Sequence, residues 1–295
     1  MNRKIDYKIN KNDTGKTVEG FLKERGYTHQ VLVRLKQTDH GILRNGIWAY
    51  TNERLCKDDL ITVQIVENEC SDNISPVNLP LDIAYEDDDI IVINKPFDMP
   101  AHPSAGNHDN TLANALMYYY GSQNKPFVYR CINRLDRDTT GLTIVAKHAL
   151  AGGILGNAVA KRAIHRTYYA VCSGCTPAYM RISAPIARKD ASTIERCVDF
   201  KRGENAVTDF IRIKYNPDNN LSLVKLRLLT GRTHQIRVHM KYIGFPLIGD
   251  FLYNPDYTYI SRQALHSGRL VFTHPVTGQK MNLISDIPSD MKSLF

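Results

Sequence analysis

One short segment of the chain, residues 130–141, is crowded with side chains that could take part in chemistry. Within it, Asp136 lies between Arg134 and Arg137, and positive charges on both sides favour the ionised form of a carboxylate. Such a carboxylate suits a nucleophile or an electrostatic stabiliser better than a general acid. The alternative is that Asp136 and Asp138 are turn residues that pair with the neighbouring arginines, and the spacing leaves both interpretations open.

A second segment of this kind, residues 229–239, contains two arginines, two histidines and a glutamine. Its pattern predicts a strand that ends near residue 229 and a helix that begins near His234. The free N–H groups and the dipole at the start of a helix attract anions, and Arg232 lies close to that point. Arg237 lies about one turn into the helix, but helical side chains lean toward the N-terminus, so it can reach the same place. The alternative is the ordinary polarity of an exposed helix.

The sequence lacks the patterns that indicate a metal or a cofactor. His234 and His239 are five residues apart, which puts them on different faces of a helix. The Cys-x-x-Cys pair formed by Cys172 and Cys175 has no second pair to complete a zinc site. No glycine-rich dinucleotide loop, Walker-type loop or Gly-x-Ser-x-Gly motif occurs. We therefore expect neither a metal nor a cofactor.

Positive charge is concentrated in one part of the chain. Residues 1–75 contain 12 Lys and Arg against 11 Asp and Glu, whereas residues 129–241 contain 20 against 8. That surplus of twelve exceeds the net charge of +8 of the whole chain. A charged run is often only a solvated face. Concentration in one block, rather than in a tail, favours a surface that binds a polyanion.

The two reactive segments belong to a large unit in which strands outnumber helices. Continuous apolar runs at 90–93 and 142–146 predict buried strands, and residues 168–171, 208–213 and 221–229 predict further ones. A helix capped by Thr111 should bury Leu112, Ala115, Leu116 and Tyr119, and another should span 234–243. Because strands and helices do not alternate regularly, we predict an α+β fold with a mixed, mainly antiparallel sheet flanked by helices and loops.

A smaller unit precedes it. Val18, Phe21 and Leu22 predict one helix and Thr28 caps a second, and a hairpin at residues 45–46 and a strand at 60–66 follow. We expect the first dozen residues to be frayed, with a weak edge strand at most. Residues 71–80 read as a linker, so we divide the chain into domains 1–75 and 76–295 and expect the larger to fold without the smaller.

The chain has no stretch of about 20 apolar residues that could span a membrane, and no secretory signal follows its first residues. Its six cysteines are scattered, unlike those of a disulfide scaffold. We expect a cytoplasmic, monomeric protein.

Four separated motifs resemble, in order, those of the RluA-type pseudouridine synthases, which isomerise uridine in ribosomal or transfer RNA. The motifs are Tyr85-Glu86-Asp87-Asp88-Asp89 through Asn94-Lys95-Pro96 with His102-Pro103, Arg134-Leu135-Asp136 with Thr140-Gly141-Leu142, His165-Arg166-Thr167-Tyr168-Tyr169-Ala170, and residues 229–239 followed by 244–250. The resemblance covers about residues 80–290. Residues 15–70 resemble, more loosely, the small alpha-L RNA-binding domain of a ribosomal protein and of many of these synthases.

The resemblance implies a pseudouridine-synthase-like catalytic domain in which Asp136 is the catalytic aspartate. Tyr168 would lie against the target base, and Arg237 would pair with Asp136. Arg134 would enter the RNA where the flipped uridine leaves. Together with the charge pattern, this predicts that RNA is bound by Arg134, Arg137, Lys95, Arg166, Arg232, His234, Arg34 and Lys36.

The sequence departs from the family at two places that concern the fit of the substrate. Asn133 stands where the family usually has histidine, and His165-Arg166 stand where a basic pair dominated by lysine is usual. Neither departure removes the catalytic aspartate.

The resulting hypothesis is a pseudouridine synthase that acts on structured RNA, with ribosomal RNA as the first expectation and transfer RNA as the second. A single ionised carboxylate can attack the substrate or stabilise a cationic sugar, whereas a glycoside hydrolase normally needs two carboxylates. Two alternatives remain: a non-catalytic RNA-binding or ribosome-assembly protein, and a glycosylase that would release uracil.

Overall fold

The computed structural model describes residues 2–104, 106–190 and 194–295, and its first elements form a small N-terminal module. Its two helices, α1 (Val18–Glu24) and α2 (His29–Gln37), accompany an antiparallel sheet of order β1-β4-β2-β3. The other elements are β1 (Asn2–Lys8), η1 (Lys11–Asp13), β2 (Ile42–Arg44), β3 (Ile47–Trp48) and β4 (Leu60–Val66). Thr17 and Thr28 each accept a hydrogen bond from a free N–H of the helix that follows. The predicted two helices and hairpin sheet are present.

The prediction of a frayed N-terminus is wrong. Strand β1 pairs with β4 along its whole length, from Asn2 opposite Val66 to Lys8 opposite Leu60. Ile5 and Ile9 are buried in the core of the module. A few apolar residues are enough to form this strand because its backbone N–H and C=O groups form hydrogen bonds with β4. The sequence pattern does not reveal this pairing.

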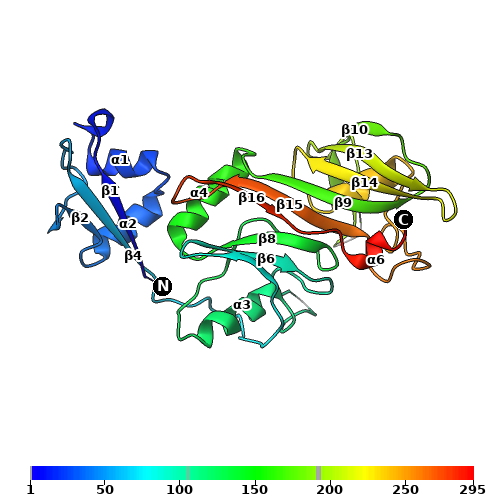
Figure 1. Cartoon of the computed structure of the whole chain (residues 1–295), viewed down its shortest axis with the longest axis horizontal. Coiled ribbons are helices and arrows are strands. Elements are labelled where there is room, and N and C mark those ends of the chain that lie inside the picture. The colour runs from blue at the N-terminus through cyan, green and yellow to red at the C-terminus, as the bar shows by residue number, and fades with distance from the viewer. Residues whose placement is uncertain (1, 105, 191–193) are drawn as a thin grey trace.

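A ten-stranded sheet forms the centre of the larger unit (Figure 1). Its order is β10-β13-β14-β9-β15-β8-β6-β5, with β16 beside β15 and β7 beside β8; β15 and β8 are parallel, and the other pairs are antiparallel. The strands are β5 (Ile83–Glu86), β6 (Ile90–Lys95), β7 (Arg130–Cys131), β8 (Thr140–Ala146), β9 (His165–Ser173), β10 (Tyr179–Ser183), β13 (Val207–Asn216), β14 (Leu221–Leu228), β15 (Leu265–Thr273) and β16 (Lys280–Ile284). A separate pair joins β11 (Ile186–Arg188) to β12 (Arg196–Val198). The predicted α+β fold with a mixed, mainly antiparallel sheet is confirmed.

Helices cover both faces of this sheet. They are α3 (Leu112–Gly121), α4 (Ala149–Ala160), α5 (Gln235–Tyr242) and the short α6 (Ser289–Lys292). Ile91 and Ile93 of β6 pack with α3, whereas Ile90 and Val92 pack with α4, which explains why residues 90–93 of this strand are all apolar. Within the described residues, no helix is long and apolar enough to cross a membrane.

The inward face of α3 differs slightly from the prediction. Tyr120 is fully buried beside Phe127, whereas Tyr119 is half-buried and donates a hydrogen bond to Glu86. The segment after β4 lies against this helix, because the Asn114 side chain donates to the carbonyl of Ser75 (2.7 Å). The predicted linker is therefore irregular but packed.

Helix α4 joins the module to the larger unit (Figure 1). Leu150 of α4 is 1% exposed and belongs to the hydrophobic core of the module, and Ile154 packs against the same core. At the start of α4, Glu67 accepts a hydrogen bond from the Ala149 N–H and forms an ion pair with Arg130 (2.8 Å). Side chains of α4 are thus part of the hydrophobic core of the module.

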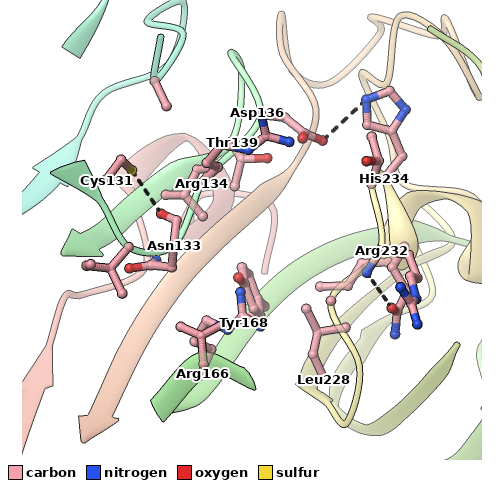
Figure 2. Close-up of a pocket in the computed structure, with 18 of the residues that line it drawn as sticks. Cys131, Asn133, Arg134, Asp136, Thr139, Arg166, Tyr168, Leu228, Arg232 and His234 are labelled. Carbon is pink, nitrogen blue, oxygen red and sulfur yellow. Dashed lines mark hydrogen bonds and ion pairs between the residues drawn. The ribbon is translucent and has the colours of Figure 1, made fainter. Parts of the chain in front are cut away.

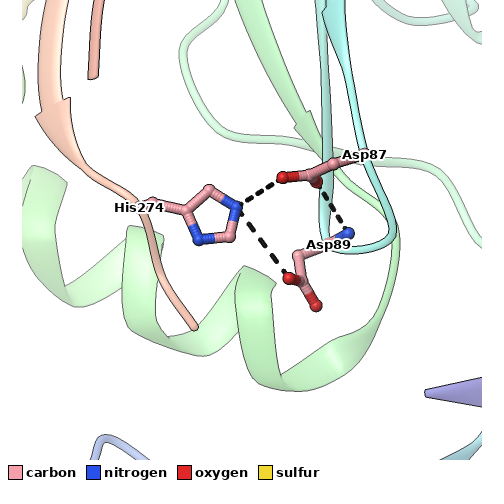
Figure 3. A group of neighbouring side chains, drawn as sticks. All are labelled: Asp87, Asp89 and His274. Carbon is pink, nitrogen blue, oxygen red and sulfur yellow. Dashed lines mark hydrogen bonds and ion pairs between the residues drawn. The ribbon is translucent and has the colours of Figure 1, made fainter. Parts of the chain in front are cut away.

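A polar cluster lies at the same junction (Figure 3). His274 contacts Asp87 at 2.8 Å and Asp89 at 3.9 Å, and Asp89 also accepts hydrogen bonds from Arg3 of β1 (2.8 Å) and His148 (2.9 Å). Burial opposes ionisation of Asp89, but the hydrogen bonds from His148 and Arg3 outweigh it and lower its pKa. Since protein cations already contact these carboxylates, we interpret the cluster as an ion-pair network that holds β1 in place.

We expect a chain that lacks residues 1–75 to be markedly less stable than the intact protein. The deletion uncovers Leu150 and Ile154 and removes the Glu67 partner of α4. Re-exposing one such side chain costs about 2 kcal/mol. Differential scanning calorimetry of the intact and shortened chains tests this. Equal melting temperatures would contradict it and would support the simple division at residue 75. Replacing the uncovered Leu150 by glutamine in the shortened chain should make that chain more soluble, because it removes an exposed apolar side chain.

Candidate active site

A pocket of about 960 Å³ lies where four segments distant in the sequence meet. The lining residues come from 100–104, 131–139, 159–168 and 227–237, and Leu265 of β15 completes them. Figure 2 shows Arg134 and Asn133 on one side, His234 and Arg232 on the other, and Tyr168 between them. The described lining contains one carboxylate, that of Asp136. It also contains the cationic or ionisable side chains of Arg134, Arg137, Arg162, Arg166, Arg227, Arg232, Arg237, His102, His165 and His234. The pocket is therefore suited to a polyanion.

The two reactive segments meet through an ion pair. The Arg237 Nη1 donates a hydrogen bond to Oδ2 of Asp136 at 2.9 Å, across 101 positions of sequence. The Asp136 side chain is 32% exposed, whereas that of Arg237 is 2% exposed. One face of the carboxylate therefore remains open to the pocket, while the arginine holds the other.

Arg237 is held in turn by Asp250, which is fully buried. Its Nε and Nη2 donate to Oδ2 and Oδ1 of Asp250, both at 2.7 Å. Burial alone would lower the pKa of Arg237, but the hydrogen bonds to Asp250 and the charge of Asp136 raise it above its ordinary value. Gly249, with φ of +66°, precedes Asp250, and a Cβ there would lie 2.1 Å from the carbonyl oxygen of Arg262. Arg237 is thus a permanent cation with a fixed direction.

Sequence reasoning did not assign Asp250 a function. It was visible only as the last residue of the motif at 244–250, and the spacing of that motif does not reveal a partner in α5. The sequence feature that could have singled out Asp250 was its position directly after Gly249.

Lys95 holds the loop that carries Asp136 in place. The prediction that Lys95 binds RNA is wrong, because its side chain is 1% exposed and Nζ donates to the carbonyls of Pro96 (2.7 Å) and Arg137 (2.9 Å). Burial lowers the pKa of Lys95 to about 7, against the opposing charges of Asp138 and Asp136. The loop ends at Gly141, where φ is +108° and a Cβ would lie 2.3 Å from the carbonyl oxygen of Ser267.

Asn133 faces the backbone of β8, although it also lines the pocket. Its amide donates to the carbonyl of Leu142 (3.2 Å) and accepts from the N–H of Ile144 (2.8 Å). The residue that replaces the usual histidine therefore ties the loop to the sheet.

Tyr168 lies on β9, on the floor of the pocket (Figure 2). It is 4% exposed and packs in one cluster with Leu135 and Ile236. Among the described residues, its hydroxyl has no hydrogen-bond partner. The ring is therefore placed to contact a planar substrate and the hydroxyl is free to bind it.

His234 lies beside the ion pair, with Nε2 3.9 Å from Oδ2 of Asp136. Its backbone is left-handed, with φ of 56°, and its Nδ1 contacts the Tyr253 hydroxyl at 3.0 Å. Burial lowers the pKa of His234, although the charge of Asp136 opposes the shift. The lowered pKa favours the neutral imidazole, which can contact a substrate without adding a charge.

The other residues predicted to bind RNA fall into three groups. Arg134 and Arg166 line the pocket, and no described carboxylate forms an ion pair with either. Arg232 and Arg137 also line it but are paired with Glu204 and Asp138. Arg34 and Lys36 lie outside the pocket on α2, where they contact Glu69 and Glu19, each at 3.5 Å.

The sequence matches a family model described as RNA pseudouridylate synthase over residues 89–242. A Bacillus subtilis protein named "Uncharacterized RNA pseudouridine synthase YjbO" is 38% identical over 95% of this chain and 98% of its own length. The "Ribosomal large subunit pseudouridine synthase D" of Zymomonas mobilis is 38% identical over 80% of this chain and 78% of its own length.

A comparison with solved structures points to the same family. The structure titled "Human RNA Pseudouridylate Synthase Domain Containing 1" superposes with a TM-score of 0.60 and 26% identity, covering 70% of this chain and 83% of that one. The aspartate, tyrosine and arginine expected from the sequence motifs meet in one pocket of the matched region. The chain belongs to the RNA pseudouridylate synthase family, and its enzymatic activity is the isomerisation of uridine in RNA to pseudouridine.

Proposed function

We propose that this enzyme modifies uridines of large-subunit ribosomal RNA and that Asp136 is its catalytic residue. One observation carries the proposal: Asp136 is the only carboxylate among the described residues of a pocket lined by seven arginines. The printed names of relatives such as the Zymomonas mobilis protein support ribosomal RNA as the substrate. A cytoplasmic location and a monomeric state, in which one chain supplies the whole pocket, belong to the same proposal.

The reaction exchanges one bond between base and sugar for another. The bond between C1′ of ribose and N1 of uracil breaks, the base turns in place, and a bond from C1′ to C5 forms. C5 then loses its proton and N1 gains one, so only protons are exchanged with water. Asp136 either attacks the substrate covalently or stabilises positive charge on the sugar, and both routes need an ionised carboxylate with an open face.

The neighbouring side chains have complementary tasks in this proposal. Arg237 keeps Asp136 ionised and directed into the pocket, and Tyr168 packs against the uracil ring. A paired uridine must leave its stack first, which costs a few kcal/mol. Arg134 lines the pocket and is exposed, so it can fill the vacated place in the RNA.

Incubation of the enzyme with RNA from cells that lack its gene, followed by nucleoside chromatography, tests the reaction. We expect pseudouridine and no free uracil. Release of uracil would indicate a glycosylase, and an unchanged nucleoside profile would indicate a non-catalytic RNA-binding protein. Mapping the modified positions then tests the proposed RNA, because modification confined to transfer RNA would contradict a ribosomal substrate.

RNA affinity should fall steeply as salt rises, because each phosphate that a cation neutralises releases counterions. If about five phosphates are contacted, the affinity falls about 100-fold between about 50 and 200 mM salt. Filter binding at several salt concentrations gives the slope. Arg134→Gln and Arg166→Gln should each reduce the slope, whereas Lys292→Gln, on α6, should not. An affinity that is nearly independent of salt would contradict a phosphate-binding surface.

A further inference from the structure

We propose that His234 is a second catalytic residue, whose Nε2–H donates a hydrogen bond to the uracil carbonyl oxygen beside the bond that breaks. This role rests on the proposed function and complements that of Asp136. The carboxylate acts on the substrate through its negative charge, whereas the departing base itself becomes negative and needs a hydrogen-bond donor. Contacts with Tyr253 and Asp136 fix both the proton and the direction of the imidazole.

The Tyr253 hydroxyl determines which nitrogen of His234 carries the proton. The backbone N–H of Arg196 donates to this hydroxyl oxygen at 2.9 Å, so the oxygen is an acceptor there. Among the described residues, the one other partner of the hydroxyl is Nδ1 of His234, at 3.0 Å, and the phenol proton is directed to it. Because Nδ1 accepts this bond, the single proton of the neutral imidazole is on Nε2.

The other ring nitrogen faces Asp136 across the pocket (Figure 2). Nε2 lies 3.9 Å from Oδ2 of Asp136, which is too far for a direct hydrogen bond but close enough for both side chains to contact one nucleotide. Burial lowers the pKa of His234, which favours the neutral donor over a cation that would pair with Asp136. The Nε2 proton is therefore free for a substrate.

Tyr253 is itself held by the residues that surround Arg237. It is 6% exposed, its backbone N–H donates to Oδ1 of Asp250 at 3.2 Å, and the Arg237 guanidinium lies 5.0 Å from the centre of its ring. Burial raises the pKa of Tyr253 to about 12, so its hydroxyl keeps the proton at neutral pH. One buried carboxylate thus positions both Arg237 and the tyrosine that directs His234.

The backbone of His234 is strained, and the strain does not serve the helix. Its φ of 56° and ψ of 19° are left-handed, a conformation that costs energy for a residue other than glycine. His234 stands at the N-cap position of α5, yet its side chain makes no capping hydrogen bond. The strained conformation instead directs the imidazole to Tyr253 and Asp136.

A donor at this place assists both halves of the reaction. When the bond from C1′ to N1 breaks, its electron pair stays on the base, and the negative charge spreads over N1 and O2, the carbonyl oxygen nearest to C1′. A half-turn of the base about the axis through N3 and C6 exchanges N1 with C5 and O2 with O4. Nε2–H can therefore donate to O2 as the first bond breaks and to O4 as C5 bonds to C1′, and the proton stays on His234 throughout.

A matched pair of variants isolates the donor. Glutamine and methionine have similar lengths and neither favours a left-handed backbone, so His234→Gln and His234→Met strain the chain alike, but only glutamine offers an N–H. With RNA from cells that lack the gene, we expect His234→Met to lower kcat about 100-fold, the usual effect of removing one donor to a developing oxyanion. His234→Gln should retain about tenfold more activity, because its amide restores part of the hydrogen bond. Both should match the native enzyme in filter binding.

Tyr253→Phe tests the positioning role of the tyrosine. Phenylalanine keeps the ring against Arg237 and the backbone bond to Asp250 but removes the hydroxyl. We expect kcat to fall about fivefold, the factor that corresponds to one neutral hydrogen bond, with little change in KM. Tyr120→Phe is the matched control, because it removes a buried hydroxyl that donates to Glu86 at 2.9 Å, away from the described lining of the pocket. It should leave kcat unchanged.

NMR of protein with nitrogen-15-labelled histidine measures the tautomer without any reaction. Among the signals of the 10 histidines, those of His234 are the ones absent from His234→Gln. At about pH 8, above the ordinary pKa of histidine, we expect Nε2 to carry the proton in the native protein. The Nδ1 signal should shift in Tyr253→Phe, because the hydroxyl that donates to it is gone.

Four results would overturn this role of His234. They are equal kcat in His234→Gln and His234→Met, a loss of RNA affinity with native kcat, a proton on Nδ1 in the native protein, and equal kcat in Tyr253→Phe and Tyr120→Phe. Failure of the proposed function looks different, because the native enzyme would then form no pseudouridine. An active native enzyme with any of the four results refutes the role of His234 alone.

Discussion

Replacing Asp136 by asparagine is expected to abolish pseudouridine formation while leaving the fold and the RNA affinity nearly intact. Asparagine preserves size and hydrogen bonding but removes the negative charge that both reaction routes need. Loss of a nucleophile of this kind lowers turnover by a factor on the order of 10⁴ or more. Nucleoside chromatography measures the loss, and filter binding measures the affinity. Full activity in the variant would refute the assignment of Asp136.

The effect of Asp136→Asn on stability should be modest. Breaking a fully buried ion pair costs about 3–5 kcal/mol. Here Asp136 is partly exposed, and Arg237 retains both hydrogen bonds to Asp250. We therefore expect a smaller decrease in melting temperature and normal yields of folded protein.

Asp138→Asn is the matched control for this experiment. Asp138 is two positions away, but its carboxylate pairs with Arg137 at 3.1 Å, and it is not among the described residues that line the pocket. It should therefore keep most of the activity. Equal loss in both variants would favour a mechanism with two carboxylates.

The second large effect is expected for Asp250→Asn. This change leaves the buried guanidinium of Arg237 without its fully buried counterion, which typically costs about 3–5 kcal/mol. For a chain of this size, that lowers the melting temperature by about 10 °C. Because Arg237 also directs Asp136, we expect kcat to fall about 100-fold while RNA affinity stays close to native.

A second arginine–aspartate pair separates this positioning role from a general loss of stability. Arg262 is also buried and donates two hydrogen bonds, of 2.8 and 2.9 Å, to Asp290. Asp290→Asn should lower the melting temperature but leave kcat unchanged, because neither residue lines the described part of the pocket. An equal fall of kcat in both variants would contradict a specific role for Asp250.

Local patterns predicted the parts of the fold that are defined by neighbouring residues. Strands β6 and β8 were evident because both of their faces are buried, so their sequences contain continuous apolar runs such as residues 90–93 and 144–146. The start of α2 followed from Thr28, whose side chain caps it. Helix α4 escaped prediction because it is rich in alanine and glycine and lacks an amphipathic pattern. Of its glycines, Gly153 lies against Thr28 of the N-terminal module, which the local sequence does not reveal.

The sequence by itself identified the segments that carry the chemistry of this enzyme. The aspartate flanked by arginines and the basic segment at a strand–helix junction each consist of neighbouring residues, so both can be recognised without the structure. Only the tertiary structure decided how these elements are used. Lys95 looked like an RNA ligand but is buried under the catalytic loop, and Asp250 looked like the end of a motif but directs Arg237. Burial and long-range pairing set these roles, because a charge removed from water must find its partner in space, wherever that partner lies along the chain.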